Sequence, residues 1–287
     1  MSDDNFLTNV RTSTVGKTKA FPTNVCEPRL IRFSSAYSFK KGLTLSDVGD
    51  CFKVRGFFIP THLIKSNMTV QLKIGGNCIN EIQIELLHLL NTKTDLENYI
   101  DFNYDLFFED PIFVYLLQYH RVEIIFTNIP DEIKDIDVVF DAMWLDQSIM
   151  KDGKRAKHLT HMKEPYKYKK VCNGIIQNIL ISGAKSNLKR VEVGCDVSKK
   201  QYKLLNYDER FISIYGNAVT DKMTCFNMNS TQQLSCHNPN WGFHAYTHET
   251  VTIDVEQKEP HEYEVYYLST NTLCYENGMG ECRFNWL

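Results

Sequence analysis

The feature that most constrains this chain is a period of two in its apolar residues, which recurs along most of its length. The clearest case is DIDVVFDAMW, residues 135–144, where Ile136, Val138 and Phe140 alternate with polar or smaller residues. Such alternation is typical of a strand with one buried and one exposed face. Segments of this kind follow one another at spacings of about 8 to 15 residues. The pattern predicts a protein dominated by sheets.

Other segments share this alternation and are predicted to be strands: 52–58, 69–74, 120–127, 191–197, 211–215, 250–255 and 262–267. In the stretch from Glu81 to Tyr104 the apolar spacing fits a helix instead, and we predict one short helix there. Because crossover helices are missing between the strands, parallel pairing is disfavoured. The predicted fold class is all-β, with two tandem antiparallel β-sandwiches and few short helices. One sandwich with a smaller second β domain is the alternative.

Changes in composition suggest the domain boundaries. Residues 1–28 are polar and lack periodicity, which predicts an extended N-terminal arm. Residues 151–170 are rich in charge and follow the last clean strand of the first half, so we expect a linker there. The two sandwiches would then cover residues 29–150 and 171–287. A chain of 287 residues is long enough for both.

Charge and cysteine content narrow the function classes. The net charge is −3, from 32 basic and 35 acidic residues without long blocks, so we expect no direct nucleic-acid binding. The basic clusters at 151–157 and 163–170 are interpreted as solvated loops, with a phosphate-binding or partner surface as the alternative. Nine cysteines without a CxxC pair predict mostly reduced thiols in a cytosolic setting. We expect neither a signal peptide nor a transmembrane segment.

One stretch, CHNPNWGFHAYTHE at residues 236–249, gathers possible metal ligands. Two histidines four residues apart share a face only on a helix, whereas the Asn, Pro and Gly residues here favour a loop. We therefore predict ordinary loop residues and no bound metal. A zinc or iron enzyme centred on His244 and His248 is the alternative. The possible ligands are Cys236, His237, His244, His248 and Glu249.

Tyrosines are dense near the C-terminus, at Tyr263, Tyr266, Tyr267 and Tyr275. They are interpreted as packing residues of a sheet, with carbohydrate stacking as the alternative. A receptor- or glycan-binding module would also use Trp241, Phe243 and Tyr246. Because no nucleophile, phosphate-binding or zinc-protease motif is present, we predict no enzyme, no catalytic residue and no cofactor.

The segment LQYHRVEIIF, residues 117–126, and the later WLD, residues 144–146, resemble the jelly-roll capsid proteins of nucleocytoplasmic large DNA viruses. In that family a strand of the form L-Q-Y-H-x-V-x-I is followed by a strand that ends in aromatic-Leu-Asp. Weaker similarities lie in LKIGGNCINEI, residues 72–82, and NTLCYENGMGECRF, residues 271–284. The acidic-basic pair that usually follows Leu-Asp is not recognisable at residues 147–150, and the chain is short for a major capsid protein.

The resemblance implies a compact double jelly roll and a structural virion protein that is assembled in the host cytoplasm. It implies homotrimers that form pseudo-hexagonal capsomers of an icosahedral shell, with other capsid proteins as further partners and with contact to an underlying membrane layer as an option. A minor, penton-like or scaffold-like capsid paralogue is the alternative within the family. On this interpretation His120 is a structural strand residue, on the same face as Val122 and Ile124.

Overall fold

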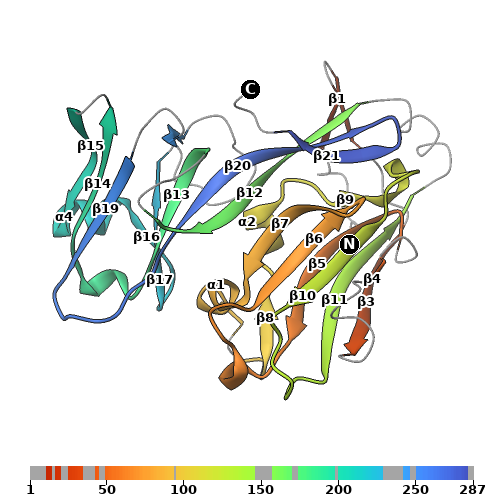
Figure 1. The fold of residues 1–287 in the computed structure, drawn as a ribbon, viewed down its shortest axis with the longest axis horizontal. Helices are drawn as coiled ribbons and strands as arrows, with labels where there is room; N and C mark the ends of the chain where they lie inside the picture. The colour runs from red at the N-terminus through yellow and green to blue at the C-terminus, as the bar shows by residue number, and fades with distance from the viewer. Residues whose placement is uncertain are drawn as a thin grey trace, which may run out of the picture. The chain divides into compact units, whose positions relative to one another are not determined.

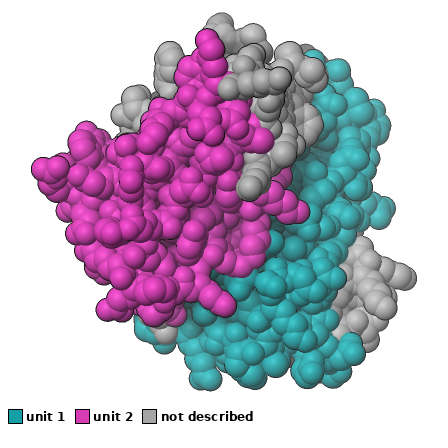
Figure 2. Space-filling model, turned by 60° about the vertical axis from the view of Figure 1, so that its left-hand side comes forward, with its two compact units in different colours: residues 1–162, 271–283 teal, residues 163–270, 284–287 magenta. Residues whose placement is uncertain are grey.

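The computed structural model of the chain (Figure 1) describes residues 11–14, 17–20, 25–34, 43–44, 49–93, 95–145, 157–169, 174–197, 200–228, 242–245 and 250–283. The chain divides into two compact units, coloured separately in Figure 2. Unit 1 comprises residues 1–162 and 271–283, and unit 2 comprises residues 163–270 and 284–287. Among the described residues, the chain passes between the units twice, within strand β12 (His158–Lys167) and within strand β20 (Val265–Glu276).

Two antiparallel sheets form the body of unit 1. One has the strand order β4-β10-β6-β7, and the other has the order β3-β11-β5-β8, with β9 also paired to β5. The strands are β3 (Val25–Ser34), β4 (Leu43–Thr44), β5 (Cys51–Phe58), β6 (Thr69–Ile74), β7 (Asn77–Gln83), β8 (Tyr99–Asp101), β9 (Ile112–Phe113), β10 (Val122–Thr127) and β11 (Asp135–Trp144).

The alternating apolar residues of these strands form the core between the two sheets of unit 1. Val122, Ile124 and Phe126 of β10 are buried, while the residues between them are partly exposed. On the facing sheet, Phe57 of β5 brings its ring to 5.4 Å from that of Phe126, measured between centroids. This contact closes one layer onto the other, which makes unit 1 an antiparallel β-sandwich.

Shorter elements complete unit 1. Strands β1 (Arg11–Thr14) and β2 (Lys17–Ala20) pair with each other, and β1 also pairs with the start of β12. The last half of β20 forms a hairpin with β21 (Met279–Arg283). The helical elements are η1 (Thr61–Leu63), α1 (Ile84–Leu89), α2 (Tyr104–Phe107) and η2 (Val114–Leu116).

Unit 2 is a second antiparallel sandwich. One sheet has the order β16-β17-β13-β20-β12, with β18 paired to β13, and the other has the order β15-β14-β19. The elements are β13 (Ile175–Ser182), η3 (Lys185–Asn187), β14 (Leu188–Val197), β15 (Lys200–Asp208), α4 (Glu209–Tyr215), β16 (Gly216–Thr220), β17 (Met223–Asn227), β18 (Phe243–His244) and β19 (Thr250–Gln257).

Both sheets of unit 2 contribute to a single apolar core. Its buried residues are Ile176, Ile179, Ile181, Leu188, Val191, Val193, Ile212, Phe226, Ala245, Val251, Ile253, Val265 and Tyr267. The fold class is therefore all-β, with two antiparallel β-sandwiches and few short helices, as predicted. None of the described helices is long and apolar enough to cross a membrane.

Three of the predicted elements need correction. Residues 211–215 lie in α4 rather than in a strand, because the Asp208 carboxylate accepts hydrogen bonds from the amides of Arg210 and Phe211 and so caps a helix. The strand predicted from residue 120 begins at Val122. The strand predicted from residue 262 begins at Val265. The one short helix predicted between residues 81 and 104 is present as α1, between β7 and β8.

The division of the chain also differs from the expected one. The predicted linker, 151–170, contains β12, whose residues His158, Thr160 and Met162 are buried while Leu159 and His161 between them are partly exposed. The predicted N-terminal arm, 1–28, contains β1 and β2 and the first residues of β3. Residues 271–283, expected in the second sandwich, belong to unit 1. Buried polar residues of β12, such as His158 and Thr160, obscured its period in the sequence.

Candidate functional site

His120 lies just before β10 and joins two turns of unit 1. Its ring Nδ1 accepts a hydrogen bond from the Gly280 amide at 3.2 Å. The ring also covers Gly75, which has a φ of +59°, and a Cβ at Gly75 would lie 2.7 Å from the imidazole Cγ. The prediction of a structural role fits this position, although the residue precedes the strand instead of belonging to it. His120 fastens the C-terminal hairpin to the turn that follows β6.

The possible metal ligands of residues 236–249 are only partly described. His244 is an exposed residue of β18, and its backbone lies opposite Ile175 of β13. Cys236, His237, His248 and Glu249 lie outside the described residues, as do Trp241 and Tyr246. Among the described residues, no three His, Cys, Asp or Glu side chains gather in a group that could hold a metal ion.

Three of the four C-terminal tyrosines are buried and so present no open ring face. Tyr267 belongs to the core of unit 2, and Tyr275 meets Phe113 in unit 1 with ring centroids 5.6 Å apart. Tyr266 is also buried, whereas Tyr263 is partly exposed. A sugar-stacking platform needs accessible ring faces. These tyrosines therefore pack within their units, as the favoured interpretation expected.

Part of the second basic cluster, Lys163 and Lys167, lies on strand β12 instead of in a loop. Lys163 is fully buried in unit 2, and its Nζ donates a hydrogen bond to Asn178 Oδ1 at 2.8 Å. Asn178 in turn donates to Asn227 Oδ1 at 2.6 Å. Lys167 forms an ion pair with Glu264. The solvated-loop interpretation is wrong for Lys163, because the lysine lies on a strand instead of a loop; Lys151, Lys154 and Arg155 of the first cluster lie outside the described residues.

Six cysteines are described, and none of these six forms a disulfide: Cys51, Cys78, Cys195, Cys225, Cys274 and Cys282. Burial raises the pKa of Cys225 to about 12 and that of Cys51 well above its ordinary value. Because the thiolate is the reactive form, neither of these two residues is suited to act as a nucleophile at neutral pH.

An ionisable cluster lies inside unit 1. Asp110 is only 3% exposed, and its burial together with the nearby Glu109 raises its pKa to about 8. Two hydrogen bonds join Glu109 and His161: the Glu109 amide donates to the His161 carbonyl at 3.0 Å, and the His161 amide donates to the Glu109 side-chain Oε2 at 3.2 Å. Burial lowers the pKa of His161. Asp110 is buried while Glu109 and His161 are partly exposed, so the protonation of Asp110 affects the stability of unit 1.

An exposed apolar surface lies on α4, and it was not predicted from the sequence. Phe211, Ile214 and Tyr215, here called the α4 face, are 45%, 63% and 43% exposed. The rings of Phe211 and Tyr215 both stack on Tyr207 of β15, with centroids 6.0 Å and 5.4 Å away. Ile212 anchors the helix in the core. The Asp residue that caps α4, followed by apolar residues at helical spacing, was the signal that could have revealed this surface.

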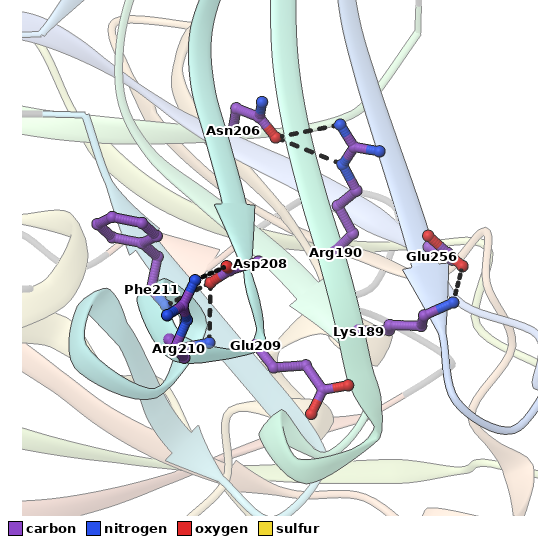
Figure 3. A pocket seen from close by; sticks show the side chains of 8 residues that line it. All are labelled: Lys189, Arg190, Asn206, Asp208, Glu209, Arg210, Phe211 and Glu256. Atoms are coloured by element: carbon purple, nitrogen blue, oxygen red, sulfur yellow. Dashed lines mark hydrogen bonds and ion pairs between the residues drawn. The ribbon is translucent and has the colours of Figure 1, made fainter.

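An open hollow of about 670 Å³ adjoins the α4 face (Figure 3). Around it, exposed ion pairs join Asp208 to Arg210 and Lys189 to Glu256. Arg190 donates hydrogen bonds to Asn206 at its upper side in the figure. The lining residues are Lys189, Arg190, Asn206, Asp208, Glu209, Arg210, Phe211 and Glu256. Both signs of charge and one aromatic ring therefore meet at a single surface.

The two antiparallel sandwiches, between which the described chain passes within β12 and within β20, define a double jelly-roll protein. Solved structures with this fold include VP54 of PBCV-1, as fitted into a cryo-EM reconstruction of the virophage Sputnik, with a TM-score of 0.61 and 10% sequence identity. A chain from a quasi-atomic model of the PBCV-1 virus capsid gives a TM-score of 0.60 at 11% identity. Each alignment covers 93% of this chain and 99% of the other.

This structural likeness confirms the double jelly roll predicted from the sequence. No known family model matches the chain, and no curated protein matches its sequence. The likeness is therefore one of fold, at a sequence identity of 10 or 11%.

Proposed function

We propose that this chain is a structural protein of a virus capsid. The observation that carries the proposal is the extent of the fold likeness: 93% of this chain aligns with 99% of a chain from the PBCV-1 capsid. Both sandwiches are thus included in the match. Resemblance of residues 117–124 and 144–146 to capsid jelly rolls supports the same conclusion independently of the coordinates.

The finer proposal is a homotrimer that serves as a pseudo-hexagonal capsomer of an icosahedral shell. Three copies of a chain with two similar sandwiches present six similar blocks around one axis, and cyclic association buries the contacting surfaces in a closed ring. The partners would be further copies of this chain and other capsid proteins. We place the protein in the virion, after assembly in the host cytoplasm, and assign it no enzymatic activity.

The close packing inside each unit supports the role of a rigid building block that resists mechanical deformation. Unit 1 closes its two sheets with buried aromatic pairs such as Phe57 and Phe126, and unit 2 has one continuous apolar core. Closely packed interiors have low compressibility. Asp110, a described carboxylate whose pKa is raised to about 8, is buried inside unit 1. These features suit a rigid building block.

Light scattering on the full-length chain, with reductant at neutral pH, tests the proposal. We expect a particle of three times the 33.4 kDa chain mass, stable on dilution into the low micromolar range. A pentamer would favour the penton-like alternative. A monomer that persists at high protein concentration would contradict the capsomer. Electron microscopy of the trimer fraction should then display six-lobed particles.

A further inference from the structure

We propose that the α4 face is a contact surface through which two copies of this chain pair by the same patch. The inference rests on the proposed function, because a shell sets many copies of one chain side by side. It goes further by naming the surface and its partner. The surface is the α4 face with the adjoining hollow, and the partner is the same surface on a second copy.

The first observation is the exposure of apolar side chains on a short helix. Three of the seven residues of α4 are large, apolar and more than two fifths exposed. Stacking on Tyr207 already holds the rings of Phe211 and Tyr215 in place. Side chains ordered before contact lose little conformational entropy when they are buried, which favours association.

The second observation is the shape and lining of the hollow. Of the eight lining residues only Phe211 is apolar, and the hollow is open to solvent (Figure 3). Small-molecule sites are mostly apolar and enclose their ligand. An open hollow beside a projecting apolar helix instead suits a protein surface, because the helix of one copy can approach the hollow of the other. A two-fold pair makes this contact twice.

The third observation identifies the partner through charge. Four acidic residues, Asp208, Glu209, Glu256 and Glu192, stand against four basic residues, Arg210, Lys258, Lys189 and Arg190, and each acid is ion-paired with one of these bases. A rim with balanced signs neither attracts a strongly charged partner nor repels a copy of itself. Two copies facing each other can exchange these exposed ion pairs without leaving a charge unpaired.

The patch is small, so the pairing should be weak for isolated particles. Stable interfaces bury about 800 Å² on each partner, more than one short helix supplies. Many weak contacts act together in a shell, because each new contact becomes intramolecular once neighbouring contacts have formed. We therefore expect association that depends on concentration rather than a permanent dimer.

Sedimentation of the full-length protein over a range of concentrations tests the apolar part. Ile214→Asp places a charge on the exposed face without touching the core. We expect it to weaken the association between particles of the full-length protein by about tenfold or more. Tyr202→Ser is the matched control, since Tyr202 is exposed on β15 and does not line the hollow. Equal association of both variants and the parent would overturn the proposal, as would the absence of any association by the parent up to solubility.

A charge-exchange experiment tests the identity of the partner. Glu209→Lys with Glu256→Lys makes a basic rim, and Lys189→Glu with Arg210→Glu makes an acidic rim. Each variant alone should repel its own copies and associate less than the parent, while an equal mixture should recover association. Failure of the mixture to recover would overturn pairing between two copies of this face.

These outcomes are distinct from those of the proposed function. The mass of the smallest stable particle in solution tests the capsomer. Association of that particle with further particles tests the α4 face. A stable trimer whose further association ignores Ile214→Asp would refute the α4 inference and leave the capsomer intact. If the smallest particle is a single chain, and its dimerisation depends on Ile214, the capsomer is refuted and the α4 face is supported.

Discussion

Phe57 of β5 and Phe126 of β10 meet edge to face, at 5.4 Å and 79°, and so connect the two sheets of unit 1. Both rings are buried, so each contributes both apolar burial and a favourable ring contact. Phe126→Ala should lower the free energy of unfolding by about 3 to 5 kcal/mol. Urea unfolding would measure the loss.

A double-mutant cycle separates the ring contact from simple burial. Phe57→Leu and Phe126→Leu keep most of the apolar volume and remove the aromatic pair. We expect a coupling free energy of about 0.5 to 1.5 kcal/mol between the two positions. Strict additivity would mean that the edge-to-face geometry contributes nothing beyond burial.

Asp110 should make the protein less stable as the pH rises. Its pKa is about 8 in the folded chain, above the ordinary value of 3.8, so the folded state holds a proton that the unfolded state releases between these values. Stability from this group is fully present below about pH 4 and is lost as the pH rises toward about 8, with a slope of at most about 1.4 kcal/mol per pH unit.

The comparison of Asp110→Asn with the parent isolates this effect. His161 has a lowered pKa and acts in the opposite direction, because its neutral form is favoured on folding. The difference between the two chains removes that contribution. We expect the advantage of Asp110→Asn to grow from pH 5 to pH 8 in urea unfolding measurements. A difference independent of pH would show that Asp110 is ionised in the folded state.

The turn after β6 offers a matched pair of glycine substitutions. Gly75 and Gly76 both have positive φ, but a Cβ at Gly75 would meet the His120 ring at 2.7 Å whereas one at Gly76 would meet nothing within 4 Å. Gly76→Ala should therefore cost about 1 kcal/mol of backbone strain. Gly75→Ala should cost about 1 to 3 kcal/mol more, because the ring must move.

Removal of the ring tests this explanation of the glycine pair. In a His120→Ala background the extra loss of stability caused by Gly75→Ala should disappear, and the two alanine substitutions should become equal. Thermal unfolding of the four chains gives the comparison. A persistent difference would assign the effect to the backbone alone.

The buried Lys163 depends on its amide partner. Asn178→Ala deletes the acceptor at 2.8 Å from Lys163 Nζ and also the donor to Asn227. We expect a loss of about 3 kcal/mol, since a buried charge then lacks one of its hydrogen bonds. Asn206→Ala, which removes an exposed amide beside Arg190, is the control and should change stability by less than about 0.5 kcal/mol. Equal small effects would mean that water replaces the lost amide.

The sequence predicted the elements in which burial alone sets the pattern. Segment 135–144 became β11 because its inward residues, such as Val138 and Phe140, are all apolar. The pattern failed where a local hydrogen bond or a buried polar residue decided the structure. Asp208 capped α4 across an apparent strand, and β12 buries His158, Thr160 and Lys163, which hid its period.

The candidate surfaces were harder to predict than the fold. Residues 207, 211 and 215 lie together because β15 is followed directly by helix α4. The predicted strand at 211–215 would not have brought them together. Likewise, the role of His120 depends on Gly280, which is 160 residues away in sequence. Contacts of that separation leave no mark in a local pattern of apolar residues.

The chain leaves unit 1 within β12 and returns to it within β20, so residues 163–270 are an insertion in the sequence of unit 1. During synthesis on a ribosome, this inserted segment emerges in full before residues 271–283. Nearly all of unit 2 can therefore fold while unit 1 still lacks its last hairpin, the reverse of the usual N-terminal-first order. Until Gly280 emerges, His120 has no hairpin to hold, so the first sandwich to begin translation is still incomplete when nearly all of the second has been synthesised.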